Sequence, residues 1–216
     1  MPQLFERSDV LLVKLILLVP AGLIVLTILG MVWQATSPVT EGVAVDQPIA
    51  FSHKHHVGDD GIDCRYCHTS VETSATAGMP STGICLTCHA QLYRDAPALA
   101  PLHASLREHK PIQWNRVYDL PDFVFFNHSI HVNKGVACIT CHGHVDRMPV
   151  MLREEPLDMQ WCLNCHRDPE NYVGPPDHVF SMSISPRLNA QERAQLLHAL
   201  SLQSRQRLTD CSTCHR

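Results

Sequence analysis

The 216-residue sequence contains no cysteine outside one repeated motif. Its ten cysteines form five Cys-x-x-Cys-His motifs, and no Cys-x-x-Cys-Lys variant occurs. The motifs are Cys64–His68, Cys85–His89, Cys138–His142, Cys162–His166 and Cys211–His215. The sequence also has no basic patch of the kind that binds nucleic acid, and its formal net charge is −4. The absence of any spare thiol points to a cofactor that uses every cysteine pair.

Cys-x-x-Cys-His is the attachment motif of c-type haem. Its two thiols form thioethers with the haem vinyl groups, and its His ligates the iron from the proximal side. Structural zinc takes Cys-x-x-Cys pairs two at a time and requires no His after each pair, so five pairs cannot all be used in four-thiolate sites. We therefore predict five covalently bound haem c groups. The predicted attachment residues are Cys64, Cys67, Cys85, Cys88, Cys138, Cys141, Cys162, Cys165, Cys211 and Cys214, and the predicted proximal ligands are His68, His89, His142, His166 and His215.

Five haems strongly constrain the fold and the charge of the protein. About 180 residues follow the N-terminal apolar segment and must enclose all five. A small domain usually needs staples to compensate for a thin core, and covalent haem supplies them. We predict a mostly α-helical and irregular multihaem cytochrome c with little β structure. With every propionate ionised, the holoprotein would carry a net charge of roughly −9 when oxidised and roughly −14 when reduced.

The N-terminal segment contains 19 consecutive residues without a charge, from Leu15 to Trp33. That length suffices for a helix to span a bilayer. A cleaved signal peptide has a shorter apolar region that ends at a small-residue cleavage site, and residues 33–37 match such a site poorly. We predict an uncleaved transmembrane anchor within residues 1–36.

The charges beside this segment predict its orientation. Arg7 and Lys14 lie at one end, whereas residues 34–50 contain no Lys or Arg. The positive-inside rule then places residues 1–9 in the cytoplasm. We predict a single-pass protein of the bacterial cytoplasmic membrane with its haem domain on the periplasmic face, where haem is attached to such motifs.

The chain after this segment contains an internal repeat. Phe51–His56 and Phe126–His131 both have the pattern Phe-x-His-x-x-His, and their histidines are offset by 75 residues. Each copy is followed by a haem motif, a spacer and a second haem motif. The predicted divisions are the anchor (1–36), a first dihaem unit (37–99), a linker (100–122), a second dihaem unit (123–168), and a connector, helix and last haem motif (169–216).

The repeat also indicates the distal iron ligands. Two histidines at i and i+3 lie on one face of a helical turn, so each could reach a different haem. We predict that His53, His56, His128 and His131 serve four haems, although His55 could replace either of its neighbours. In the fifth haem, a Met would be the usual partner of the proximal His. Met148 and Met182 are the preferred candidates for that position, ahead of Met151, Met159, His144 and His178.

One helix is predicted near the C-terminus, from Asn189 to about Leu208. Asn189 and Glu192 form a candidate capping box, and apolar residues recur at helical spacing after them.

Several segments resemble the pentahaem cytochrome c subunit of bacterial alternative complex III. They are Pro48–Gly58, Gly61–His68, Lys110–Trp114, Asp119–Phe123, Phe126–Val132 and the closing Leu208–Arg216. The haem-binding half is also similar to class III multihaem cytochromes, in which Phe-x-His-x-x-His supplies distal ligands. The resemblance implies membrane partners: an iron–sulfur subunit resembling molybdopterin oxidoreductases, polytopic quinol-binding subunits and a monohaem cytochrome c.

These features bear on three functions. The preferred prediction is an electron-relay subunit, with no catalysis of its own, in a quinol-oxidising respiratory or photosynthetic complex that passes electrons towards a periplasmic acceptor. The alternative is a stand-alone membrane-anchored quinol dehydrogenase that feeds periplasmic reductases. A haem enzyme acting on a small molecule is disfavoured, because it needs an open or displaceable sixth position on iron and the chain has enough His and Met to fill every one.

Overall fold

The computed structural model describes residues 7–36, 41–183 and 188–215. The chain divides into two compact units, Met1–Thr40 and Glu41–Arg216, and each is described by itself. Of the predicted cytoplasmic tip, residues 1–9, residues 1–6 lie outside the described residues. The predicted dihaem units and linker fall within the second unit apart from residues 37–40, and their boundaries stay a prediction.

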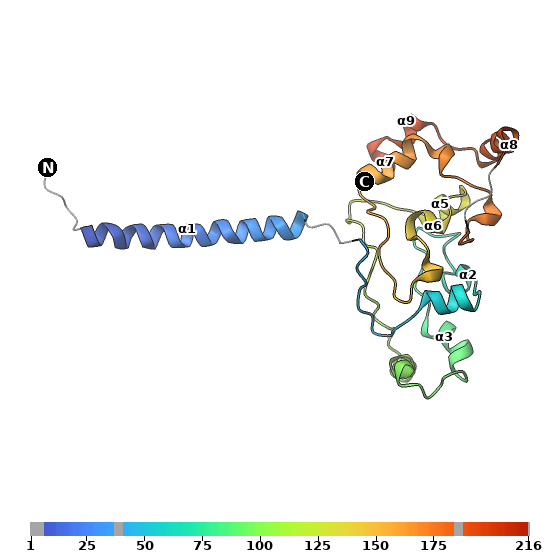
Figure 1. Cartoon of the computed structure of the whole chain (residues 1–216), viewed down its shortest axis with the longest axis horizontal. Helices are drawn as coiled ribbons and strands as arrows, with labels where there is room; N and C mark the ends of the chain where they lie inside the picture. The colour runs from blue at the N-terminus through green and yellow to red at the C-terminus, as the bar shows by residue number, and fades with distance from the viewer. Residues whose placement is uncertain (1–6, 37–40, 184–187, 216) are drawn as a thin grey trace. The chain divides into compact units, whose positions relative to one another are not determined.

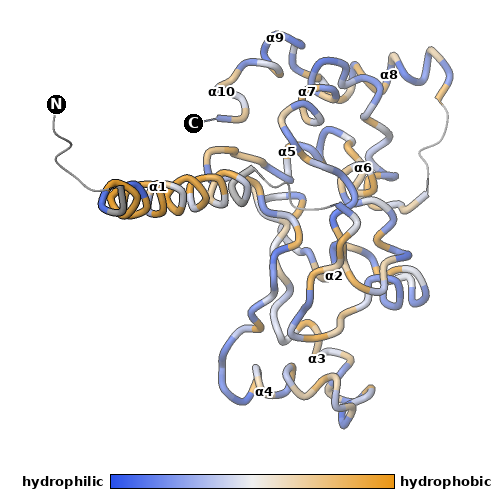
Figure 2. Tube along the Cα trace, turned by 60° about the vertical axis from the view of Figure 1, so that its left-hand side comes forward, coloured by the Kyte–Doolittle hydropathy of each residue, from blue (hydrophilic) through white to orange (hydrophobic). Residues whose placement is uncertain are grey.

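The first unit is the helix α1 (Arg7–Thr36). Its segment Asp9–Trp33 has 25 residues and a mean hydropathy of 2.8, which is long and apolar enough to cross a membrane by length and composition. Most of its residues are hydrophobic by the colour scale of Figure 2. Pro20 lies inside the helix, a position that membrane helices tolerate. The expected long apolar helix is present, and its role as a retained anchor stays a prediction.

The second unit consists of short helices joined by irregular segments (Figure 1). Its elements are η1 (Lys54–Asp59, a π-helix), α2 (Cys64–Cys67), α3 (Thr82–His89), η2 (Pro97–Leu99), α4 (Ala100–Glu108), α5 (His128–Asn133), α6 (Cys138–His142), η3 (Val145–Arg147), α7 (Met159–Arg167), η4 (Pro169–Asn171), η5 (Pro176–His178), α8 (Ala190–Leu200), α9 (Arg205–Leu208) and α10 (Cys211–Cys214). In the part of the chain that the structure describes, β pairing is confined to isolated bridges. The predicted fold class, mostly helical and irregular, is confirmed.

The apolar core of this unit is small. Its main cluster is formed by Val71, Val132 and Val179, with Phe180 and Cys138 packed against it. Val71 belongs to the first repeat, Val132 to the second, and Val179 to the connector that follows the second repeat. The cluster therefore joins segments that are distant in sequence, although too few side chains are buried to form a large core.

Close backbone contacts hold η1 against η3. The backbone N–H of Lys54 donates to the carbonyl oxygen of Met148 at 2.9 Å. A β-carbon on Gly58 would overlap the carbonyl oxygen of Asp146, so only glycine permits this approach. The Phe51–His56 segment of the first repeat is thus held against the residues that follow the third haem motif.

The prediction of one helix from Asn189 to Leu208 is wrong in its extent. The capping box of Asn189 and Glu192 is present and begins α8 as expected. The helix ends at Leu200, because Ser201 takes a left-handed conformation with φ of 47°. Ser204 then caps the separate helix α9 by accepting a hydrogen bond from the backbone N–H of Arg207.

Candidate haem-binding sites

Each Cys-x-x-Cys-His motif forms one turn of helix, on α2, α3, α6, α7 and α10. The i, i+3 spacing places the two thiols of a motif on one helical face. Aspartates begin three of these helices: the side chains of Asp63, Asp158 and Asp210 accept hydrogen bonds from backbone N–H groups of the first turn. Local sequence thus presents both thiols of a motif towards the same side.

Four of the five predicted proximal histidines are held by backbone carbonyls. The Nδ1 atoms of His68 and His166 each lie 2.8 Å from a carbonyl oxygen, of Gly78 and Leu208 respectively. Nδ1 of His89 lies 3.1 Å from the oxygen of Leu92, and Nδ1 of His215 lies 3.2 Å from that of Phe123. A carbonyl only accepts, so Nδ1 carries the proton. Nε2 is left with a free lone pair, as a metal ligand requires.

The remaining proximal histidine, His142 of the third motif, is held differently. The centres of the His142 and Tyr118 rings lie 4.5 Å apart. Burial lowers the pKa of His142 to about 4, and the nearby His128, His68 and His53 act in the same direction. The ring is therefore neutral at physiological pH, which is the form that binds metal. Sequence reasoning missed Tyr118, since a lone Tyr in a linker carries no motif.

The two Phe-x-His-x-x-His segments have nearly the same geometry. Phe51 meets His53 edge to face at 4.9 Å and stacks on His56 at 4.6 Å. Phe126 meets His128 edge to face at 4.8 Å and stacks on His131 at 4.4 Å. The first pair lies at the start of η1 and the second on α5. The duplication seen in the sequence is thus reproduced in the ring geometry.

Carbonyl hydrogen bonds also orient three of the four predicted distal histidines. Nδ1 of His56 donates to the oxygen of Ser52 at 2.9 Å, and Nδ1 of His131 donates to that of Asn127 at 2.8 Å. Nδ1 of His128 donates to the oxygen of Ala75 at 2.9 Å. Nδ1 of His53 is buried and has no hydrogen-bond partner among the described residues. Burial lowers the pKa of His53 to about 4, so this ring is neutral as well.

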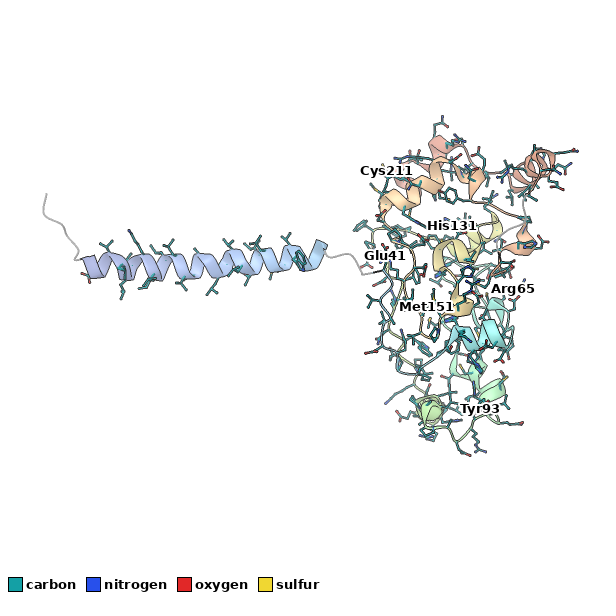
Figure 3. All side chains as sticks on the ribbon, viewed as in Figure 1. Glu41, Arg65, Tyr93, His131, Met151 and Cys211 are labelled. Atoms are coloured by element: carbon teal, nitrogen blue, oxygen red, sulfur yellow. The ribbon has the colours of Figure 1, made fainter. Side chains whose placement is uncertain are left out.

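Three distal rings lie at one characteristic distance from proximal rings. The ring centres are 6.0 Å apart for His56 and His89, 6.4 Å for His128 and His142, and 6.1 Å for His131 and His166. Since an imidazole nitrogen binds a metal at about 2 Å, and the ring centre lies about 1 Å beyond it, two imidazoles on opposite faces of one iron have centres roughly 6 Å apart. All three pairs therefore fit an iron held between them (Figure 3 labels His131 on α5).

The remaining distal histidine, His53, lies near His68. Burial, and after it the nearby His68, lower the pKa of His53. In the three pairs with measured ring separations, His128 approaches the first motif after it, and His56 and His131 each approach the second motif after them.

Neighbouring thiols and side chains place the five motifs in a definite order. Tyr66 of the first motif hydrogen bonds to Thr87 of the second at 2.8 Å, and burial together with the nearby Cys85 thiol raises the pKa of Cys67. The thiols of Cys64 and Cys138 lie close enough that each shifts the pKa of the other, which joins the first motif to the third.

The same kind of contact continues through the second half. Burial, and after it the nearby thiols of Cys165 and Cys162 in the fourth motif, raise the pKa of Cys141 in the third. Burial and the nearby Cys214 thiol of the fifth motif likewise raise the pKa of Cys162. The motifs are therefore arranged in the order second, first, third, fourth, fifth. Figure 1 shows the corresponding helices α3, α2, α6 and α7 following one another through the unit, and Figure 2 places α10 beside α7 and α9.

The structure places the two preferred Met candidates away from the fifth motif. Met148 is buried beside η1, where its carbonyl oxygen accepts from Lys54. Met182 lines a surface hollow of about 300 Å³ together with Cys64 and Phe180. Figure 3 shows Met151 well separated from Cys211. The fifth distal ligand thus stays a prediction without a described contact to support it.

The other histidines have different surroundings. The ring of His55 lies on the surface within 3.6 Å of Asp59, and His144 lies 3.2 Å from Asp146. His103 and His178 each have one buried ring nitrogen without a hydrogen-bond partner among the described residues.

Two comparisons with known proteins agree with this geometry. Residues 49–101 and 124–216 match the family described as cytochrome c7 and related cytochrome c, a span that includes all five motifs. The chain is also 34% identical over 134 residues to the multiheme cytochrome c subunit of menaquinone reductase from Nitratidesulfovibrio vulgaris. That match covers 62% of this chain and 57% of the relative. Since the family match spans well over half of the sequence, the chain belongs to the cytochrome c7 and related cytochrome c family and is a multihaem cytochrome c.

Proposed function

We propose that the chain is a membrane-anchored pentahaem electron relay. Its four bis-His haems would pair His53 with His68, His56 with His89, His128 with His142, and His131 with His166. The three ring separations of about 6 Å are the observation that carries this proposal. The fifth haem, attached at Cys211 and Cys214 with His215 as proximal ligand, would take its sixth ligand from Met148 or Met182.

The order of the motifs supports a relay with two ends. Haem sites in a single row exchange electrons between neighbours, so an electron entering at the second haem would leave at the fifth, or the reverse. Since six-coordinate irons have no open position for a small substrate, the row would carry electrons and perform no chemistry of its own.

The redox partner we propose is linked to menaquinone. The relative of known name is a subunit of a menaquinone reductase, whereas the sequence resemblance pointed to alternative complex III. The comparison therefore supports the alternative drawn from the sequence, a membrane-anchored multihaem quinol dehydrogenase that feeds periplasmic reductases, over alternative complex III, and the relative's description as a subunit favours a complex over a stand-alone enzyme. Membership of alternative complex III, with its iron–sulfur, polytopic and monohaem subunits, becomes the second candidate.

Quinone chemistry itself would take place in a partner. The apolar run from Leu15 to Trp33 contains no acid, His or Tyr that could exchange the two protons of a quinol. The chain would then supply electrons to, or take them from, a membrane subunit that binds the quinone.

The test is purification of the chain from detergent-solubilised membranes, followed by identification of the proteins that accompany it. We expect polytopic membrane subunits in the preparation. The purified assembly should exchange electrons between its haems and menaquinone or menaquinol, and the faster direction gives its physiological role. The isolated chain should be reduced by dithionite but should stay oxidised with menaquinol. Rapid reduction of the isolated chain by menaquinol would instead establish a stand-alone quinol dehydrogenase.

A further inference from the structure

Arg153 is a buried charged side chain in the second unit, with 8% of its surface exposed. It lies between the third haem motif and α7, in a segment without secondary structure. The backbone N–H of Gly42 donates to its carbonyl oxygen at 2.8 Å, and the adjacent Leu152 forms a bridge with Ala44. The residue is thus held by backbone contacts with residues 42–44.

The guanidinium of Arg153 is held by neutral acceptors. Its Nε donates to the carbonyl oxygen of Glu155 at 3.1 Å, and a terminal nitrogen donates to that of Pro156. The carboxylate of Glu155 is used elsewhere, accepting from Nε1 of Trp161 at 2.9 Å. In the described part of the chain, no ion pair joins a carboxylate to Arg153.

This arrangement leaves a buried positive charge without a matching negative one. A guanidinium has five N–H donors in a planar fork and stays protonated in proteins. Burial of a charge is costly unless the charge is paired, so buried arginines normally have a carboxylate or another anion beside them. The remaining donors of Arg153 have the geometry that binds a carboxylate through two parallel hydrogen bonds.

The surroundings of Arg153 belong to two haem sites. Tyr118, whose pKa responds to the charge of Arg153, has its ring 4.5 Å from His142 of the third motif. The hydroxyl of Tyr118 lies 3.3 Å from the carbonyl oxygen of Cys141. On the other side, Glu155 joins the segment to Trp161 on α7, the helix of the fourth motif. The anion that reaches Arg153 must therefore come from the space around these two motifs.

We propose that Arg153 binds a propionate carboxylate of a haem in the second dihaem unit, attached at the third or the fourth motif. Each c-type haem brings two propionates, and covalent attachment at Cys138/Cys141 or Cys162/Cys165 holds one haem on each side of Arg153. The ion pair would fix the haem edge and keep the propionate ionised. The positive charge near the iron would also favour its ferrous state, because reduction removes one positive charge from the haem.

The experiment is a redox titration of the purified five-haem chain carrying Arg153→Met. We expect one haem of the five to become harder to reduce, its reduction equilibrium constant falling roughly tenfold, the effect of one charge about 10 Å from the iron at an effective dielectric of about 20. The potential of that haem should also become more dependent on pH, because the released propionate can now take up a proton when the iron is reduced. Arg153→Lys keeps the positive charge, so the reduction potential of that haem should stay close to its value in the unaltered protein.

Two controls keep the test decisive. Arg116→Met removes an exposed arginine paired with Asp119 and should leave all five haems unchanged. If Arg153→Met fails to retain five haems, Arg153→Lys is examined by resonance Raman spectroscopy, where the propionate bending band of one haem should shift. Unchanged potentials and pH dependence in a fully loaded Arg153→Met protein, or an unchanged propionate band in Arg153→Lys, would overturn the proposal.

Which of the two haems provides the propionate is decided by marking each haem in turn through removal of its proposed distal ligand. His128→Ala and His131→Ala should each convert one haem, the third or the fourth respectively, to a high-spin state. Added to these backgrounds, Arg153→Met should shift the potential of the marked haem in only one of them. The inference rests on the proposed haem assignments but not on menaquinone, so the absence of a quinone partner would leave it intact.

Discussion

At the scale of single residues, the position of the imidazole proton has the widest consequence. Seven of the predicted ligand histidines bond to a backbone carbonyl through Nδ1. The polypeptide itself therefore sets the tautomer and the ring orientation in which Nε2 can bind iron. Such preorganised rings lose little freedom when the metal binds.

The first prediction concerns His131. His131→Ala removes the ring that faces His166 at 6.1 Å, so on the proposed assignment the fourth haem would lose its sixth ligand. We expect one haem of the five to become high spin and to bind cyanide, while the other four stay low spin. Electron paramagnetic resonance of the oxidised protein measures this directly.

His55→Ala is the matched control, since His55 is a surface residue within reach of Asp59. It should leave every haem low spin. A new high-spin signal in His55→Ala, or its absence in His131→Ala, would show that the ligand assignment is wrong.

Sequence predicts residue roles where the chemistry requires a fixed pattern. The ten cysteines and their histidines follow from covalent attachment, and the matched Phe-x-His-x-x-His pairs follow from their spacing. Arg153 and Tyr118 could not be found in this way. They act through burial and through contacts with residues far away in the chain, and neither has a motif around it.

At the scale of elements, the contact of η1 with η3 positions two distal histidines. Gly58 on η1 lies so close to the carbonyl oxygen of Asp146 that no side chain fits between them. The same short helix follows His53 and contains His56. A change in this contact therefore moves the rings that face the first and second motifs.

The second prediction is that Gly58→Ala destabilises the holoprotein by about 1–3 kcal/mol, the usual cost of forcing extra volume into a packed contact. Thermal unfolding followed by circular dichroism measures the loss. A weakened low-spin signal from one or both of the first two haems should accompany it.

Gly83→Ala serves as the comparison, because Gly83 lies within α3 and an added β-carbon meets only Ser81 at an ordinary distance. Alanine is a better helix former, so this variant should be neutral or up to about 1 kcal/mol more stable. Equal effects of the two substitutions would contradict the importance of the η1–η3 contact.

Element boundaries show what sequence patterns leave open. The start of α8 was predictable, because Asn189 and Glu192 form a capping box from local residues alone. The end of α8 could not be predicted, because nothing in the residue type of Ser201 indicates that it takes a positive φ. The ammonium group of Lys134 donates to the carbonyl oxygen of Leu200 at 2.6 Å, so a distant residue helps to terminate this helix.

At the scale of the whole molecule, the order of the motifs determines which haem joins the two halves. The first and third motifs meet at Cys64 and Cys138. The third prediction is that Cys138→Ala combined with Cys141→Ala removes that haem and divides the row. After a flash reduction, the first two haems should equilibrate with each other, as should the last two, with only slow exchange between the pairs.

Removal of the second haem by Cys85→Ala and Cys88→Ala is the control. That haem lies at one end of the row, so the other four should still equilibrate in one fast phase. Fast exchange across the gap in the Cys138/Cys141 variant would disprove the proposed order.

The fourth prediction concerns α1. Its apolar segment Asp9–Trp33 should remain in the mature protein and hold it in the membrane. The protein should sediment with membranes until detergent is added, and its N-terminal sequence should begin within the first few residues. An N-terminus located after residue 33 would mean that the helix is a cleaved signal.

The order of the motifs also has a bearing on how the chain originated. Among the first four motifs, the first motif of each repeat, Cys64–His68 or Cys138–His142, lies at an inner position of the row. The second motif of each repeat lies at an outer position. This is the arrangement of two identical subunits related by a twofold axis that passes between their first haems, a self-complementary contact. A two-haem ancestor that formed such a dimer would already have possessed a four-haem conductor, and gene fusion would have made it permanent. The motif at Cys211–Cys214, which has no counterpart in the first repeat, then removes the symmetry and makes one end of the conductor distinguishable from the other.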